Sequence, residues 1–306
     1  MSNPALPDLE LRIVAPRRSV SRHLIDIWRY RELLLQLVRK ELHVRYQKSV
    51  LGFAWSMANP LFLLGIYSVV FGILGQAFES FPIWILCGLL LWNFFATALT
   101  TGTQAVTGNS YLVGKVNFPR EILPLAAVGA ALVHLFLSSC MLVVVLLVTR
   151  FDVDWGYLWL SVPAMLTCVV LVSALAILLS AVNVYARDTT HLLDLALLAF
   201  FWLTPIVYPF QLVADQLKKH GTYQYLHLLN PIVPLVTAVQ RGVYGHATIM
   251  INDPGTGKLI PKKLLPDLSS MWYLRNIGAV FAFSIILLIA AIKFFDRAEA
   301  NFAEVM

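Results

Sequence analysis

Two Gly-Lys pairs, at positions 114–115 and 257–258, are the places where a phosphate-binding loop could stand in this chain. Such a loop has the spacing G-x-x-x-x-G-K-[ST], because its backbone N–H groups cradle the phosphates and its hydroxyl holds magnesium. The first pair has Asn109 in place of the first glycine and Val116 in place of the hydroxyl residue, and the second pair fails at the same two positions. We therefore expect no ATP site and no cofactor in this chain.

Other catalytic patterns are equally absent from the sequence. It contains neither G-x-S-x-G nor H-E-x-x-H, and its polar intramembrane candidates, His134 and Asp194, fall in different apolar stretches. Three cysteines without C-x-x-C spacing argue against a disulfide framework and a metal site: Cys87, Cys140 and Cys168. An integral membrane glycan-modifying enzyme is a disfavoured alternative, because it needs several polar side chains at one depth.

The composition indicates which environment the chain occupies. Of its 306 residues, 59% are hydrophobic and 13% are charged, whereas a soluble domain carries roughly 25% charged residues. A soluble globule cannot bury so much apolar surface, so the composition predicts an integral membrane protein. The net charge of +6 is then read by its location relative to the membrane, and we expect no nucleic-acid partner.

Six apolar stretches reach the roughly 20 residues with which a helix crosses a bilayer. We expect an all-α integral membrane fold with six transmembrane helices at about 54–75, 83–105, 122–148, 158–182, 192–210 and 276–294. Residues 225–245 are a candidate for a seventh span, but Pro231 and Pro234 interrupt them, and a lipid-facing break in a helix is costly. We favour two short re-entrant helices after the fifth span, at about 212–245, over a seventh crossing.

Lysine and arginine residues set the orientation, because cytoplasmic loops carry an excess of them. Ten lie within the first 50 residues, and Lys115 and Arg120 occupy the connection after the second span. Both termini are therefore predicted in the cytoplasm, and the chain divides into a cytoplasmic segment at 1–50, a transmembrane domain at 51–295 and a cytoplasmic tail at 296–306.

Residues 20–46 have the pattern of an amphipathic helix at the inner membrane face. Its apolar side chains recur at helical spacing: Leu24, Ile27, Trp28, Leu34, Leu35, Val38 and Leu42. The helix is either a simple anchor or the wall of an entrance for a lipid-borne substrate. It is followed by a turn toward the first span in which Gly52 permits a sharp bend.

The second cytoplasmic connection, 107–125, has room for a short helix at Asn109–Val116. Pro119 suits the first turn of the next helix, and Glu121 complements the positive end of its dipole. The segment is either a peg for a cytoplasmic partner or a plain loop.

Aromatic residues within the spans are candidates for stacking on the C–H faces of sugars. Tyr67 and Phe71 stand one turn apart in the first span, and a second group lies in the fifth: Phe200, Phe201 and Trp202. The alternative is that they pack between helices. Asp194, near the start of the fifth span, is a polar intramembrane residue that Arg187 or a partner helix could satisfy.

Several motifs in order resemble those of a known family. They are RYQKSVLGFAWSMANP, NFPREILPL, NVYARD, FFWLTPIVYP and LLNPIVPLV, at 45–60, 117–125, 183–188, 200–209 and 228–236. The chain resembles the membrane subunit of bacterial polysaccharide-export ABC transporters, the Wzm-type permeases that move O-antigen, teichoic acid or galactan. The resemblance covers about residues 20–295, and within the family the overall sequence is most similar to exporters of lipid-linked galactan. The long basic stretch 252–266 departs from the pattern.

This resemblance implies a homodimer in the plasma membrane, bound to two copies of a separate P-loop ATPase that holds ATP and magnesium. It implies an entrance loop with Lys48, Ser49, Leu51 and Gly52. It implies an ATPase-coupling helix and turn with Ser110, Tyr111, Lys115, Asn117, Phe118, Pro119 and Arg120. It also implies an aromatic pore between the protomers, with Tyr67, Phe71, Phe200, Phe201 and Trp202 as candidates.

The expected function is thus that of a permease subunit for a lipid-linked polysaccharide of galactan or O-antigen type. An ABC permease for another amphipathic cargo, such as a lipid, teichoic acid or a drug, is the main alternative.

Overall fold

A computed structural model gives the fold. The residues it describes are 25, 27–47, 49, 52, 54–73, 81–116, 118–221, 226–245, 248–252, 259–300 and 302. Lys48, Leu51 and Asn117 lie outside these residues, and the side chain of Phe71 is outside them too.

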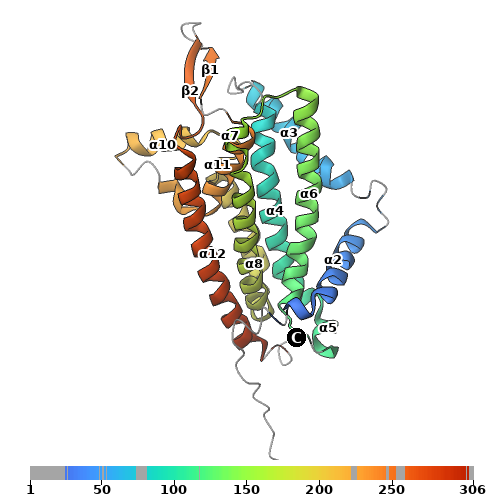
Figure 1. The fold of residues 1–306 in the computed structure, drawn as a ribbon. Helices are drawn as coiled ribbons and strands as arrows, with labels where there is room; N and C mark the ends of the chain where they lie inside the picture. The colour runs from blue at the N-terminus through green and yellow to red at the C-terminus, as the bar shows by residue number, and fades with distance from the viewer. Residues whose placement is uncertain are drawn as a thin grey trace, which may run out of the picture.

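Four stretches of helix among the described residues are long and apolar enough to cross a membrane. They are α4 (Phe81–Gly108), α6 (Ile122–Thr149), α7 with α8 (Trp155–Leu158 and Ser161–Tyr185) and α12 (Ser270–Glu299). They lie side by side in a bundle (Figure 1), with α4 between α6 and α8, and α12 against α8. They coincide with the second, third, fourth and sixth predicted spans.

Small residues allow two long helices of this bundle to approach closely. A Cβ added to Gly102 of α4 would lie 2.7 Å from the Cβ of Ala176 in α8. Glycine and alanine at one crossing let two helix backbones approach, as membrane helices require where apolar side chains give no advantage over lipid.

The first and fifth predicted spans correspond to α3 (Ala54–Ile73) and α9 (Thr189–Leu203). The predicted end of the fifth span at 210 is wrong: Thr204 has extended backbone angles and residues 204–208 are bends. Pro205 explains this, because a proline disfavours helical geometry in the residue before it. With 15 residues, α9 rises about 22 Å, which is shorter than a bilayer core of about 30 Å.

The region predicted as re-entrant contains short helices: α10 (Phe210–Lys219), the 3₁₀ helix η1 (Leu226–Leu229) and α11 (Ile232–Val243). Pro231 precedes α11, and Pro234 lies in its first turn, where helices tolerate proline because the early N–H groups have no intrahelical acceptor. The 12 residues of α11 rise about 18 Å, too little for a seventh span. All of them are buried.

One feature departs from the predicted all-α fold. Strands β1 (Thr248–Asn252) and β2 (Leu259–Lys263) form an antiparallel pair, with Thr248 opposite Lys263 and Asn252 opposite Leu259. The β-branched residues of β1 favour extended backbone. The hairpin lies at the same end of the bundle as α10 (Figure 1).

The predicted amphipathic helix corresponds in part to α2 (Arg31–Tyr46), which packs along α6. A Cβ on Gly129 would lie 2.8 Å from Val38, and Leu37 is the buried residue of α2. Trp28 and Leu35, which belong to the predicted membrane-directed apolar face, are exposed at the protein surface. In Figure 1, α2, α5 (Ser110–Lys115) and the end of α12 gather at the end of the bundle opposite the hairpin.

Candidate functional site

The predicted short helix after the second span exists as α5, and it has two different faces. Val113 points inward and is 4% exposed, in a cluster with Leu37 of α2 and Phe295 of α12. Tyr111 is 71% exposed, and the Nζ atom of Lys115 lies 4.0 Å from the centre of its ring. This arrangement fixes the helix on one side and leaves an aromatic and a cation open on the other.

A hydrogen bond joins α2 to the turn before α5. The Nζ atom of Lys40 donates to Oδ1 of Asn109 over 2.6 Å. The amide of Asn109 donates in turn to the carbonyl of Ala105, at 2.8 Å, which holds its oxygen toward Lys40. The two short helices that the sequence predicted outside the spans, α2 and α5, are therefore directly connected.

Arg120 connects three segments at the base of the bundle. Its Nε atom lies 3.4 Å from Oε1 of Glu299, and one terminal nitrogen donates to the Glu299 carbonyl at 3.1 Å. The other terminal nitrogen donates to the carbonyl of Val113 at 3.5 Å. Arg120 thus ties the end of α5 and the start of α6 to the last turn of α12. The sequence predicted a role for Arg120 but did not identify this partner.

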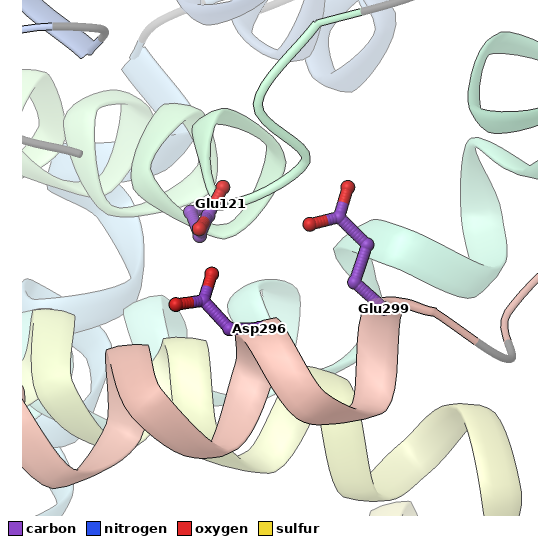
Figure 2. A group of neighbouring side chains, drawn as sticks. All are labelled: Glu121, Asp296 and Glu299. Atoms are coloured by element: carbon purple, nitrogen blue, oxygen red, sulfur yellow. The ribbon is translucent and has the colours of Figure 1, made fainter. Parts of the chain in front are cut away.

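Three carboxylates gather beside Arg120: Glu121, Asp296 and Glu299. Their oxygens lie within 4.8 Å of one another, and Glu121 is 1% exposed. Figure 2 shows Asp296 and Glu299 projecting from α12 toward Glu121, which stands just before α6. Because Arg120 contacts one member of the group, we interpret it as the acidic side of an ion-pair network and assign no metal to it.

A second contact fastens α8 to the end of α12. The hydroxyl of Tyr185 donates to the carbonyl of Ala298 at 2.7 Å, and its ring lies 6.1 Å from that of Phe302. Sequence reasoning missed Tyr185, Asp296 and Glu299. The available signal was the charge pattern, since an Arg-Glu pair opens the third span and two acids one helical turn apart close the sixth.

The predicted coupling residues divide between two environments. Ser110, Tyr111 and Lys115 are exposed on α5, whereas Phe118 and Pro119 are buried beneath it. The buried pair supports the helix, and the exposed three are available to a partner.

The predicted entrance loop is described at two of its four residues. The hydroxyl oxygen of Ser49 accepts a hydrogen bond from the Gly52 amide at 3.1 Å. Gly52 has φ +50°, a conformation that favours glycine. The tight turn inferred from Gly52 is confirmed.

The aromatic candidates come together only in part. The rings of Tyr67 and Phe201 lie 6.4 Å apart between α3 and α9, and Phe201 also contacts Trp92 of α4 at 5.5 Å. Phe200 and Trp202 are 38% and 55% exposed. Trp92 was not among the predicted pore residues.

Asp194 lies exposed on α9. In the part of the chain that the structure describes, it forms no hydrogen bond or ion pair, and it does not contact Arg187 as the sequence had allowed.

Comparison with known proteins identifies the family. The model of the ABC-2 type transporter family matches residues 32–244. The chain is 30% identical to the O-antigen export system permease protein RfbA of Myxococcus xanthus over 280 residues, 91% of this chain and 97% of the relative. It is 24% identical to the Klebsiella pneumoniae protein of the same name, over 90% of this chain and 95% of the relative.

The family and the apolar helices together describe a multi-pass membrane transport subunit, not an enzyme, that works with an ATPase subunit. The chain belongs to the ABC-2 type transporter family of membrane proteins.

Proposed function

We propose that this chain is the permease subunit of an ATP-driven exporter that moves a lipid-linked polysaccharide out of the cytoplasm across the bacterial plasma membrane. Similarity to O-antigen export permeases over nine-tenths of the chain supports the cargo class. Galactan, as the finer identity of that cargo, rests on sequence resemblance.

The two-sided geometry of α5 is the observation that carries this proposal. Helix α5 has six residues. Its exposed Tyr111 and Lys115 can contact a partner, and its buried Val113 can transmit a movement of that partner to the bundle. Arg120 can carry this movement further, because it joins α5 to α12. The partner on the exposed side is an ATPase subunit that binds ATP and magnesium, so this end of the bundle faces the cytoplasm.

A second copy of the chain is needed to form a conduit. Packed helices lie about 8–10 Å apart and leave no lumen wide enough for a glycan. Helix α9 presents an apolar face, with Leu192, Leu195 and Leu198 each more than 60% exposed. We propose that two protomers related by a two-fold axis meet near this face, with two ATPase copies below them.

The pore then lies beside the aromatic cluster of Tyr67, Trp92 and Phe201. Aromatic faces stack on sugars without a fixed hydrogen-bond register, so a polymer can move past them. Phe200 and Trp202, which are partly exposed on α9, are the side chains most available to such a polymer.

Co-expression with the P-loop ATPase encoded beside the gene tests this function. The two proteins should co-purify as a complex that hydrolyses ATP, and deletion of the permease gene should remove a polysaccharide from the cell surface. Absence of ATP hydrolysis by the purified complex would overturn the proposal. Transport of a lipid or drug with unchanged surface glycan would support the alternative cargo.

Membrane topology gives an independent test. A cysteine is introduced at Ser110 in a background variant that lacks Cys140. It should resist a membrane-impermeant thiol reagent in intact cells and react in opened cells, and the background variant alone is the control. Labelling of Ser110→Cys in intact cells would place α5 on the wrong side for an ATPase.

A further inference from the structure

A cavity of about 300 Å³ lies between the end of α2, the start of α3, and the middle of α4 and α6. Its floor is formed by buried side chains of the bundle, among them Leu90, Phe94 and Ser138. Arg45 and Trp55, both exposed, lie at its mouth. The cavity is therefore open on the side of the interface helix and closed toward the bundle, and it is separate from the aromatic cluster at Phe201.

The polar part of its lining includes several hydrogen-bond donors. Arg45 contributes a guanidinium with five N–H groups. The Nδ2 atom of Asn93 is buried and has no hydrogen-bond partner among the described residues. Ser49 accepts from the Gly52 amide through its oxygen, so its own hydroxyl hydrogen is available. The hydroxyl of Tyr46 lies 2.8 Å from Nδ1 of His134, which orders that side of the cavity.

No carboxylate lines the cavity among the described residues. The segments that enclose it carry none either, since 42–78, 81–108 and 122–149 contain neither Asp nor Glu. Glu41 stands one turn before Arg45 in α2, yet the two form no ion pair in the structure. A cation beside an unsatisfied amide, without an acid to neutralise it, is a setting that favours an anion.

The rest of the lining is apolar and aromatic. Trp55, Phe94 and Leu135 place rings and an aliphatic side chain beside the donors. A volume of about 300 Å³ is at the lower end of the range for small-ligand sites. It suits a head group of one or two phosphates with the first carbons of a hydrocarbon chain, and it is too small for a sugar polymer.

We propose that this cavity binds the phosphate end of a lipid, with Arg45 and Asn93 as its donors. The proposal depends on the proposed function only for the source of that lipid. In an exporter of lipid-linked glycan the source is a polyprenyl diphosphate carrier, and otherwise it is a bilayer phospholipid. Each presents the same chemistry to the cavity, an anionic phosphate attached to an apolar chain.

Binding of farnesyl diphosphate to the purified full-length chain in nanodiscs of dioleoylphosphatidylcholine, followed by native mass spectrometry, tests this site. We expect Arg45→Gln and Asn93→Leu each to weaken binding by about tenfold or more, because each removes donors to an anion. Arg39→Gln is the matched control, since Arg39 is an exposed arginine of α2 that does not line the cavity. Arg45→Lys should retain part of the affinity.

Two outcomes would overturn the proposal. One is wild-type affinity in both Arg45→Gln and Asn93→Leu. The other is farnesol, which lacks the phosphates, binding as tightly as farnesyl diphosphate. If either variant fails to fold, the farnesol comparison on the wild-type chain still decides the question.

Competition identifies the source of the lipid. If an excess of dioleoylphosphatidylglycerol does not displace farnesyl diphosphate, the site prefers the polyprenyl carrier; if it does, the site takes bilayer phospholipid. Both results support a phosphate site. If the wild-type complex exports no glycan but Arg45→Gln still loses farnesyl diphosphate, the proposed function falls and the site stands. If export occurs and both cavity variants bind normally, the site alone falls.

Discussion

The Nζ atom of Lys40 lies 2.6 Å from Oδ1 of Asn109, so two residues 69 positions apart join α2 to the turn that begins α5. The contact is charge-assisted, and such hydrogen bonds are stronger than neutral ones. It lies on the surface, where it adds little to stability. Its consequence is mechanical, since α2 and α5 cannot move apart without breaking it.

Replacing Lys40 by Met should therefore separate transport from ATP hydrolysis. We expect the free energy of unfolding to change by about 1 kcal/mol or less, as for other exposed charge contacts. Glycan exported per ATP hydrolysed should fall by up to about fivefold, the factor that corresponds to a contact of about 1 kcal/mol. Arg39→Gln, on the same helix, is the control. An unchanged ratio of export to hydrolysis in Lys40→Met would show that the contact does not couple the helices.

Arg120→Ala should destabilise the protein more than Glu299→Gln does. The first change removes the cation beside three clustered carboxylates, whereas the second removes one of the negative charges. We expect a loss of about 1–3 kcal/mol for Arg120→Ala, reduced by the partial exposure of this pair. Thermal unfolding in detergent checks the order. The double variant should be more stable than the sum of the two single effects predicts, and strict additivity would contradict a direct interaction.

Tyr111→Ala should weaken the association with the ATPase without affecting the fold. The side chain is 71% exposed, so little packing is lost, and tyrosine is enriched among residues that dominate protein interfaces. We expect an affinity decrease of about tenfold or more, measured by titrating the ATPase onto the permease in nanodiscs. Trp155→Ala is the control, because Trp155 is 77% exposed and begins α7, which lies at the other end of the bundle from α5 (Figure 1). Equal effects of both changes would refute a specific docking face.

Gly102→Ala should lower stability, although alanine favours helices over glycine. Its Cβ would lie 2.7 Å from that of Ala176, and overpacking of this kind costs about 1–3 kcal/mol. Gly108 belongs to the same helix and has open space around it, so Gly108→Ala should be neutral or stabilising by up to about 1 kcal/mol. Thermal unfolding of the two variants compares them directly. Equal melting temperatures would mean that α4 and α8 can move apart at no cost.

Apolar stretches long enough to cross a bilayer located the helices well, because the roughly 20-residue requirement is a strong constraint. Helix α5 was also predicted, because Asn109–Val116 has room for a short helix. The end of the fifth span was predicted too late, since the apolar pattern continues through Thr204 and Pro205 while the helix does not. Local backbone preference there outweighed hydropathy.

Contacts between distant segments could not be read from the sequence. Arg120 was recognised as part of a motif, but its partner Glu299 lies 179 positions away, and only the packing of α12 brings the two together. Trp28 and Leu35 were assigned to the apolar, membrane-directed face of the interface helix. They are exposed because α2 meets α6 along a narrower stripe centred on Leu37 and Val38.

Helix α11 has neighbours on every side, from α4 and α8 to α7 and α12, and none of its twelve residues reaches the surface. A helix enclosed in this way cannot move as a rigid body without displacing its neighbours. Any widening of that end of the protein must shift the surrounding wall together with it, since tightly packed interiors rearrange between discrete states and do not stretch. That end of the protein is then expected to change between discrete states, and single substitutions in α11 should block the change rather than leave it half complete.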